Sequence, residues 1–281
     1  MCYNKENKYQ EGLLMTGIVN KRNLFCNEWR ALTLLECKRD MLLLKQQIKM
    51  TEEAVEKKKP SDDWSFEGIC HLFAKASVAH AKMAYDNMVL GHNDAANMIL
   101  RAFIENCVSF EVIFDHEEEG LWRYYLVQSY RDTIVRPDKN TPEKDRLFLE
   151  DMYQRYDIGD DFLQKNGKKK AFIDMPYGWT YKINKNFNAE GFCNLVDEDD
   201  RMGSYTGFKM MSPYSHGTSL RNMLRGSSSL DQVMSMISTL YFFLFHLAYL
   251  YCLDSMNERY DAVTEELEWR LYKYFNLIEE D

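Results

Sequence analysis

Apolar side chains recur along this chain at steps of three and four residues, which is the spacing of one face of an α-helix. In the first such segment, residues 27–58, these positions form one seam, with Thr51 filling a gap. The seam consists of Leu34, Cys37, Met41, Leu44, Ile48 and Val55. Two interpretations stay open: the helix packs on its own domain, or the seam joins two subunits as in a coiled coil.

Helix start and stop signals divide the rest of the chain. We predict a second helix over residues 64–90 that ends at Gly91, and a third that reaches about Phe114. Two more follow over residues 118–131 and 141–159. His71 and His80 lie nine residues apart on the second helix, so they face opposite ways and cannot share a metal ion. No metal site and no cofactor are expected.

The most apolar stretch, residues 236–253, is about as long as the shortest membrane-spanning helix. It also contains His246 and several tyrosines, and acidic residues flank it. We therefore expect a buried central helix over residues 230–253, with a membrane span as the alternative. A last amphipathic helix carries Val263, Leu267 and Leu271 on one side, together with Tyr274 and Ile278.

These elements predict an all-α protein. The chain has only 13 glycines and 5 prolines, which argues against a β-sandwich or barrel rich in tight turns. We predict a multi-helix bundle with a long N-terminal helix and a short basic-aromatic insertion. In this division, residues 1–60 form the N-terminal helix, a candidate oligomerisation arm, and residues 61–281 form the bundle, with the insertion at about 160–205.

Composition excludes several classes of protein. The formal charge of −9 argues against a protein that coats duplex DNA. Seven cysteines without a C-x-x-C pair indicate reduced thiols, and the polar N-terminus lacks the pattern of a secretory signal. We therefore expect a cytoplasmic protein. Phosphate-loop, dinucleotide-binding, zinc-protease and nucleophile-elbow motifs are absent from the sequence.

The basic-aromatic segment, residues 165–187, has six lysines against one aspartate. Interleaved cations and aromatic rings are typical of proteins that bind single-stranded nucleic acid. The candidate RNA-binding residues are Lys168, Lys169, Lys170, Trp179, Tyr181 and Lys182. A short strand or hairpin is predicted around residues 179–183. The alternative is a lysine-solvated loop that its aromatic side chains hold against the protein.

Two charged residues, Arg101 and Glu105, lie four apart in an otherwise apolar part of the third helix. Both face roughly the same way, so a structural ion pair is one interpretation. In the other, Arg101 binds a phosphate and Glu105 orients a partner.

A second group of candidate catalytic residues lies on both sides of Pro213. Ser212 as a cap and Pro213 as the first residue predict a helix that starts there and closes at Gly226. His216 would then lie in the first turn, where the free amides keep its ring neutral and able to act as a general base. With Lys209 as the cation, this arrangement suits metal-independent cleavage of RNA. In the alternative, His216 only satisfies a helix end or packs between helices.

At these residues the chain resembles a large bacterial family of uncharacterised all-helical domains. The resemblance rests on residues 95–105, with Arg101 and Glu105, and on residues 208–216, with Ser212 and His216. A more distant similarity is to the HEPN (higher eukaryote and prokaryote nucleotide-binding) helical bundles, many of which are ribonucleases of toxin and antiviral systems. Their signature is an arginine followed by a histidine, and here Lys209 replaces the arginine.

Together these observations predict a bacterial cytosolic RNA-directed effector, a candidate ribonuclease of a stress or phage-defence system. His216, Lys209, Arg101, Glu105 and Ser212 form its expected catalytic set. We expect a homo-oligomer or a protein partner through the N-terminal helix. The alternative is a non-catalytic helical interaction or scaffold module, in which Arg101 and Glu105 lock the bundle and His216 closes a helix end.

Overall fold

The computed structural model describes residues 35–60, 62, 64–130, 143–163, 171–197, 204–215 and 230–275. Its described part contains helices and no strand, so the predicted all-α class is confirmed. The longer helices are α3 (Lys38–Lys57), α4 (Phe66–Val89), α5 (Asn93–Asp115), α6 (Leu121–Ser129), α8 (Glu143–Arg155), α11 (Ser204–Ser215), α13 (Leu230–Cys252) and α14 (Glu258–Tyr274). Short helical segments complete it: α9 (Asp160–Leu163), η1 (Phe172–Asp174), η2 (Gly178–Thr180), α10 (Ala189–Cys193) and η3 (Leu253–Ser255).

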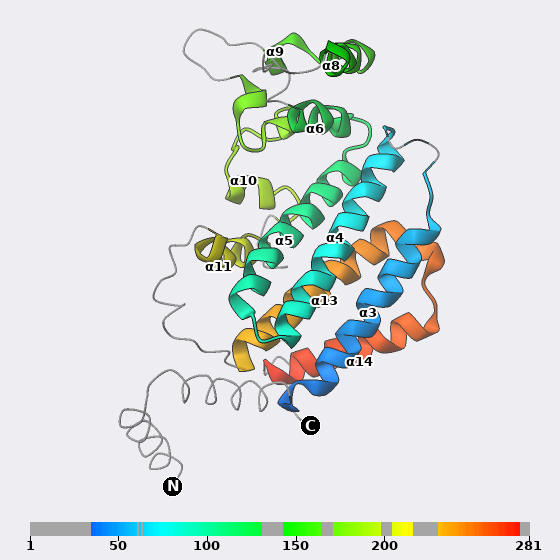
Figure 1. Cartoon of the computed structure of the whole chain (residues 1–281), viewed down its shortest axis with the longest axis vertical. Helices are drawn as coiled ribbons and strands as arrows, with labels where there is room; N and C mark the ends of the chain where they lie inside the picture. Colours follow the sequence, from blue (N-terminus) through cyan, green and yellow to red (C-terminus); the bar gives the residue numbers. More distant parts are fainter. Residues whose placement is uncertain are drawn as a thin grey trace.

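Five long helices, α3, α4, α5, α13 and α14, lie side by side and form the main bundle (Figure 1). α13 contacts the other four, and Leu240, Leu244 and Ala248 on it are inaccessible to solvent. Within the described residues, α13 is the one helix long and apolar enough to span a membrane, but more than half of its apolar window is buried inside the bundle. The predicted central helix is therefore present, and it is buried in the way that a core helix is.

The seam of α3 is buried inside the chain. Its described members all have little or no exposed surface: Cys37, Met41, Leu44, Ile48, Thr51 and Val55. They face α13, α14 and α4, and the Gln47 side chain adds a hydrogen bond to the backbone carbonyl of Tyr241 at 3.1 Å. α3 is thus an integral part of the bundle, and this seam is already covered by helices of the same chain.

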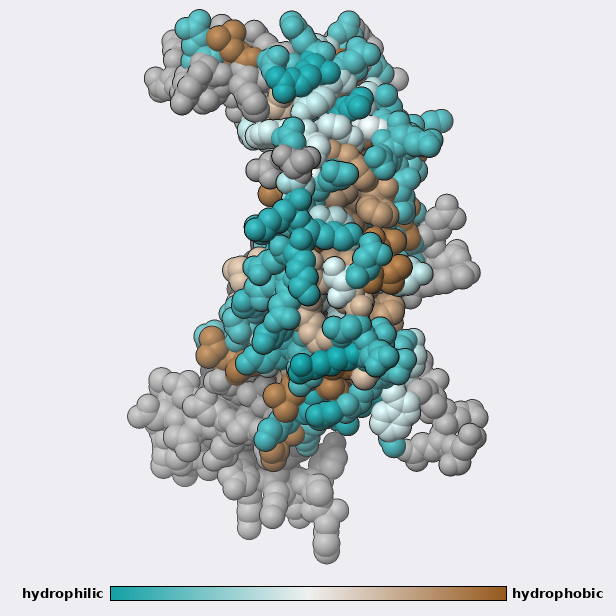
Figure 2. All heavy atoms as spheres, turned by 90° about the vertical axis from the view of Figure 1, so that its right-hand side faces the viewer, coloured by the Kyte–Doolittle hydropathy of each residue, from teal (hydrophilic) through white to brown (hydrophobic). Residues whose placement is uncertain are grey.

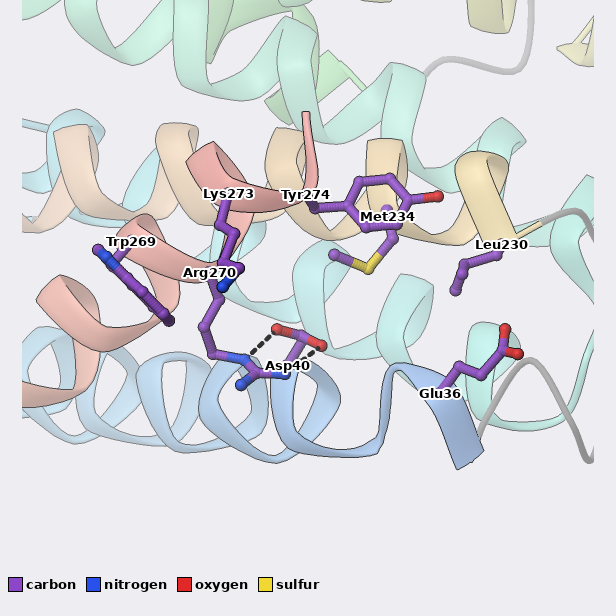
Figure 3. Close-up of a pocket in the computed structure, with 8 residues that line it drawn as sticks. All are labelled: Glu36, Asp40, Leu230, Met234, Trp269, Arg270, Lys273 and Tyr274. Carbon is purple, nitrogen blue, oxygen red and sulfur yellow. Dashed lines mark hydrogen bonds and ion pairs between the residues drawn. The ribbon is translucent and has the colours of Figure 1, made fainter. Parts of the chain in front are cut away.

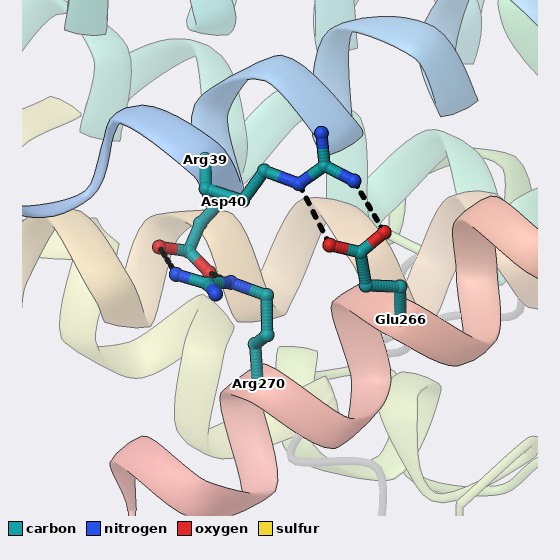
Figure 4. A network of polar contacts seen from close by, with 4 residues as sticks. All are labelled: Arg39, Asp40, Glu266 and Arg270. Atoms are coloured by element: carbon teal, nitrogen blue, oxygen red, sulfur yellow. Dashed lines mark hydrogen bonds and ion pairs between the residues drawn. The ribbon is translucent and has the colours of Figure 1, made fainter.

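Two arginine–carboxylate pairs join α3 to α14 (Figure 4). Arg39 binds Glu266 through two hydrogen bonds of 2.7 and 2.5 Å at the surface. Arg270 binds Asp40 through hydrogen bonds of 2.5 and 3.2 Å, and the Asp40 side chain is only 4% exposed. The buried carboxylate of Asp40, next to the seam of α3, is tolerated because the guanidinium compensates its charge.

Helix ends agree with the sequence signals where the signals are strong. The Ser65 hydroxyl accepts a hydrogen bond from the Gly68 amide at the start of α4, and Gly91, with φ 72°, follows its end. His71 lies 3.1 Å from the Tyr251 hydroxyl, whereas His80 lies 2.9 Å from the Asn106 amide. The two histidines thus face different helices, and the described residues contain no cluster of metal-binding side chains.

Residues 171–197 fold as tight helical turns, so the predicted strand or hairpin at residues 179–183 is wrong. The Gln128 side chain of α6 donates a hydrogen bond to the carbonyl of Met175 and accepts one from the Trp179 amide. These backbone groups of the turns therefore have hydrogen-bond partners without a neighbouring strand. Only glycine fits at position 178, since a Cβ there would lie 1.6 Å from the Phe172 carbonyl oxygen. Aromatic packing and this close backbone approach override the β-propensity of the segment.

The predicted helix start at Ser212 is also wrong, and the rest of that predicted helix, residues 216–226, lies outside the described residues. α11 begins at Ser204, where the backbone amide donates to Asp197 at 3.2 Å, and it ends at Ser215. Ser212 and Pro213 therefore occupy its last turn, and the proline, which has no N–H, cannot donate the i→i−4 hydrogen bond there, in keeping with the end of the helix two residues later. The packing of α11 on α5 extends the helix toward the N-terminus beyond what the Ser-Pro signal indicates.

The surface shows hydrophobic patches among mostly hydrophilic side chains (Figure 2). Large apolar residues that are more than a third exposed occur on α3, α4, α5, α8, α13 and α14.

Candidate functional site

The crossing of α5 and α11 brings the two sequence motifs together. The Arg101 guanidinium lies over the ring of Phe208, with Cζ 4.6 Å from the ring centroid. At the residue before Phe208, a Cβ on Gly207 would lie 3.1 Å from the Ile104 side chain, so the two helices are close here. A cation over an aromatic face is attracted to the ring electrons and held in a fixed orientation.

Glu105 binds the Tyr177 hydroxyl, which reaches α5 from the turn before η2. Burial raises the pKa of Glu105, while the charge of Arg101 and the hydrogen bond from Tyr177 partly oppose that shift. Tyr177 is itself buried against Phe192, with the two rings stacked at 4.1 Å. Burial and then the charge of Glu105 raise the pKa of the Tyr177 phenol, so it stays protonated and donates to the carboxylate.

The remaining members of the expected catalytic set are placed only in part. Lys209 is exposed, and its ammonium lies 5.9 Å from the Tyr205 ring centroid on the outer side of α11. Position 212 follows Phe208 by one turn, so the two positions share a helix face. His216 lies outside the described residues. Residues 212 and 213 end α11 and do not begin a helix, so they do not form the predicted cap and first turn before His216.

The structure thus brings together Arg101, Glu105 and Phe208, and it adds Tyr177, which sequence reasoning did not include. Tyr177 carried a weak signal, because Pro176 and Gly178 mark a turn that could present it. No periodicity links that turn to α5, so its partner could not be deduced.

The predicted nucleic-acid interface is packed against the protein where it is described. Trp179 is 3% exposed and lies between Tyr125 and Phe192, so its role as a base-stacking platform is wrong. Tyr181 stacks on Phe172 at 4.6 Å. The Lys182 ammonium lies 4.7 Å from the centroid of the Tyr124 ring. Lys168, Lys169 and Lys170 lie outside the described residues.

A separate pocket of about 440 Å³ opens between α3, α13 and α14 (Figure 3). Leu230 and Met234 supply apolar surface, and Trp269 and Tyr274 supply rings. Three of its charged groups have partners inside the pocket, since Arg270 binds Asp40 and Lys273 lies over Trp269, and Glu36 is the fourth charged residue of the lining. This mixture of apolar surface and charges of both signs specifies no ligand class.

A histidine–carboxylate pair links α5 to α13. His246 Nε2 lies 2.9 Å from the Glu111 carboxylate, which is largely buried. The hydrogen bond with Glu111 raises the pKa of His246, and burial opposes the rise only in part. The pair places a titratable contact beside the core helix.

Residues 66–232, more than half of the chain, match a family of unknown function, DUF5677. The chain belongs to this family. The matched stretch runs from the start of α4 into the first turn of α13 and includes Arg101, Glu105, Lys209, Ser212 and His216. No curated protein and no solved structure matches the chain.

Proposed function

We propose that this DUF5677 protein is a cytosolic RNA-directed effector that acts through the crossing of α5 and α11. One observation carries the proposal: Arg101 and Phe208, from motifs about 100 residues apart, are in contact. The crossing therefore gathers a guanidinium, a carboxylate and a phenol, with the exposed Lys209 next to Phe208 on α11.

The proposed roles follow from these contacts. Arg101 is held over the ring of Phe208, and its planar guanidinium can bind two phosphate oxygens at once, which a lysine cannot do. Glu105 orients Arg101 through its charge and is itself held by Tyr177. Lys209 adds an exposed cation for the RNA backbone. His216 follows α11 directly in the sequence and is the proposed proton-transfer residue, as in the distant HEPN resemblance.

Binding of fluorescently labelled single-stranded RNA to the full chain tests the proposal, with four variants compared at two salt concentrations. Lys209→Gln and Arg101→Lys are expected to weaken binding about five- to tenfold each, and Lys209→Gln also lowers the salt dependence. Lys49→Gln is the matched control, since Lys49 is exposed on α3, far from α11 in the sequence and outside the site. His216→Ala should bind RNA as the wild type does but fail to cleave it.

Absence of RNA binding by the wild-type chain would refute the proposal. Equal affinity of the Lys209→Gln, Arg101→Lys and Lys49→Gln variants would remove the site from it. Binding without cleavage by either the wild type or His216→Ala would leave an RNA-binding protein and exclude the ribonuclease.

A second function, that of a non-catalytic helical interaction module, is favoured by the bond between Glu105 and Tyr177. Both groups are largely buried, and the bond ties the turn before η2 to α5. In this function the cluster holds the helices of the bundle together. Substitutions in it then change the stability of the protein, and none of them changes RNA binding or cleavage. Thermal unfolding of Arg101→Lys and Lys209→Gln separates the two: a role in locking lowers the melting temperature of Arg101→Lys only.

A further inference from the structure

Two asparagines extend the polar row of α5 beyond Arg101. The row comprises Asn93, Asn97, Arg101 and Glu105. Because its members are four residues apart, neighbours lie about 40° apart around the helix and about 6 Å apart along it. Asn97 falls between the positions of Ile104 and Arg101, about 20° from the first and 40° from the second. Both of those residues lie against α11, so Asn97 faces α11 as well.

Both asparagines are buried without hydrogen-bond partners. Asn93 is 8% exposed and Asn97 is 5% exposed. Within the described part of the chain, the side-chain nitrogen and oxygen of Asn93 and the side-chain nitrogen of Asn97 have no partner. Burial of such groups is unfavourable, because they lose their hydrogen bonds to water and gain none in return. A ligand that supplies the missing hydrogen bonds would explain why polar groups are kept here.

Other asparagines of this protein show how an amide with a structural role is paired. The Asn184 side chain donates to the Asn186 carbonyl at 2.7 Å and accepts from the Asn186 amide at 2.8 Å. The Asn106 side chain, on the side of α5 that faces α4, lies 2.9 Å from His80 Nδ1. Asn93 and Asn97 differ from both, since their amides serve no contact within the described fold.

We propose that Asn97, with Asn93 one turn behind it, binds a base of single-stranded RNA whose phosphate is bound by Arg101. The inference rests on the proposed function and adds the base to it. Arg101 is half-buried, whereas the two asparagines are buried. The charged phosphate therefore stays near solvent, and the uncharged base enters between α5 and α11. The single turn between Asn97 and Arg101 is comparable to the separation of a base from its own phosphate.

The side-chain amide favours adenine. Its nitrogen donates and its oxygen accepts side by side, and asparagine pairs in this way with the neighbouring acceptor and donor on one edge of adenine. In single-stranded RNA the edges of the bases are open, because no second strand occupies them. We therefore expect the site to prefer adenine over uracil.

Competition between oligo(A) and oligo(U) RNA of equal length for the full chain tests the base contact. The wild type is expected to bind oligo(A) about tenfold more tightly, which is the discrimination that one bidentate base contact gives. Asn97→Leu keeps the branching of the side chain and removes its polar atoms. It should lose the preference, while its affinity for oligo(U) changes by less than about twofold.

Thermal unfolding without RNA adds a measurement that a structural role would reverse. Asn97→Leu should raise the melting temperature, because an apolar side chain of similar shape replaces an unpaired buried amide. Asn106→Leu is the matched control on the same helix. It should lower the melting temperature, because it removes the partner of His80, and it should leave the preference for oligo(A) intact.

The outcomes separate this inference from the proposed function. A wild type that binds neither RNA would refute both, whereas equal affinity for oligo(A) and oligo(U) would overturn the base contact alone. Asn97→Ala removes the amide without adding apolar volume, and it replaces Asn97→Leu in the competition if circular dichroism shows that Asn97→Leu does not fold. Retention of the preference in these variants would overturn the inference. So would a melting temperature of folded Asn97→Leu below that of the wild type, since the amide would then stabilise the fold.

Discussion

The guanidinium of Arg101 stacks on the ring of Phe208, and this contact fixes α11 on α5 at the point where the two sequence motifs meet. Phe208 is 4% exposed, so it contributes both to the cation–ring contact and to the packing of the two helices.

Replacing Phe208 should separate these two contributions. Phe208→Ala is expected to lower the free energy of unfolding by about 3 kcal/mol, through lost burial and an unfilled space. Phe208→Leu keeps most of the apolar volume and should cost about 1 kcal/mol, close to the value of one cation–ring contact plus imperfect packing. Urea denaturation measures both. A loss near zero for Phe208→Leu would mean that the ring itself contributes nothing to the position of Arg101.

The bond between Glu105 and Tyr177 should behave as a coupled pair. Glu105→Gln and Tyr177→Phe are each expected to destabilise the protein, and the double variant should lose less than the sum of the two. A coupling of about 1 to 2 kcal/mol is expected for a hydrogen bond with one charged partner. A double-mutant cycle in urea measures it. Strictly additive losses of unfolding free energy would show that the hydrogen bond does not stabilise the protein.

His246 and His80 should give opposite pH dependences. The pKa of His246 is raised by Glu111, so its contribution to stability is complete below the unfolded pKa and is lost as pH rises through the folded pKa. The pKa of His80 is lowered by burial, so its folded state loses stability as pH falls through the unfolded pKa.

Unfolding of His246→Gln and His80→Gln between pH 5.5 and about 8.5 tests this sign, in the range where histidine titrates. The loss caused by His246→Gln should grow as pH falls, up to less than about 1 kcal/mol, since solvent screens a pair that is one third exposed. The loss caused by His80→Gln should shrink as pH falls. Parallel slopes for the two variants would contradict the assigned environments.

The two arginine–carboxylate pairs between α3 and α14 should contribute very differently to the stability of the protein. Asp40→Ala leaves Arg270 half-buried without its carboxylate and is expected to cost about 3 kcal/mol. Glu266→Ala breaks an equally bidentate pair that lies in solvent, and its effect on the melting temperature should be small. Differential scanning calorimetry compares the two. A larger effect at Glu266 would show that solvent exposure does not decide the strength of these pairs.

The sequence by itself determined the helices and their buried faces. The seam of α3, the ends of α4 at Ser65 and Gly91, and the apolar α13 could all be predicted, because helix periodicity and capping depend on residues within a few positions of each other. The all-α class followed from the same local signals and from the scarcity of glycine and proline.

The tertiary structure alone decided where those helices meet. α11 starts at Ser204 and not at Ser212, because contacts with Asp197 and α5 outweigh a local Ser-Pro signal. Trp179 is buried and Tyr177 reaches Glu105, since aromatic packing between segments far apart in the chain selects tight turns over a strand. Such contacts join residues that no periodicity relates, so a single sequence carries no local trace of them.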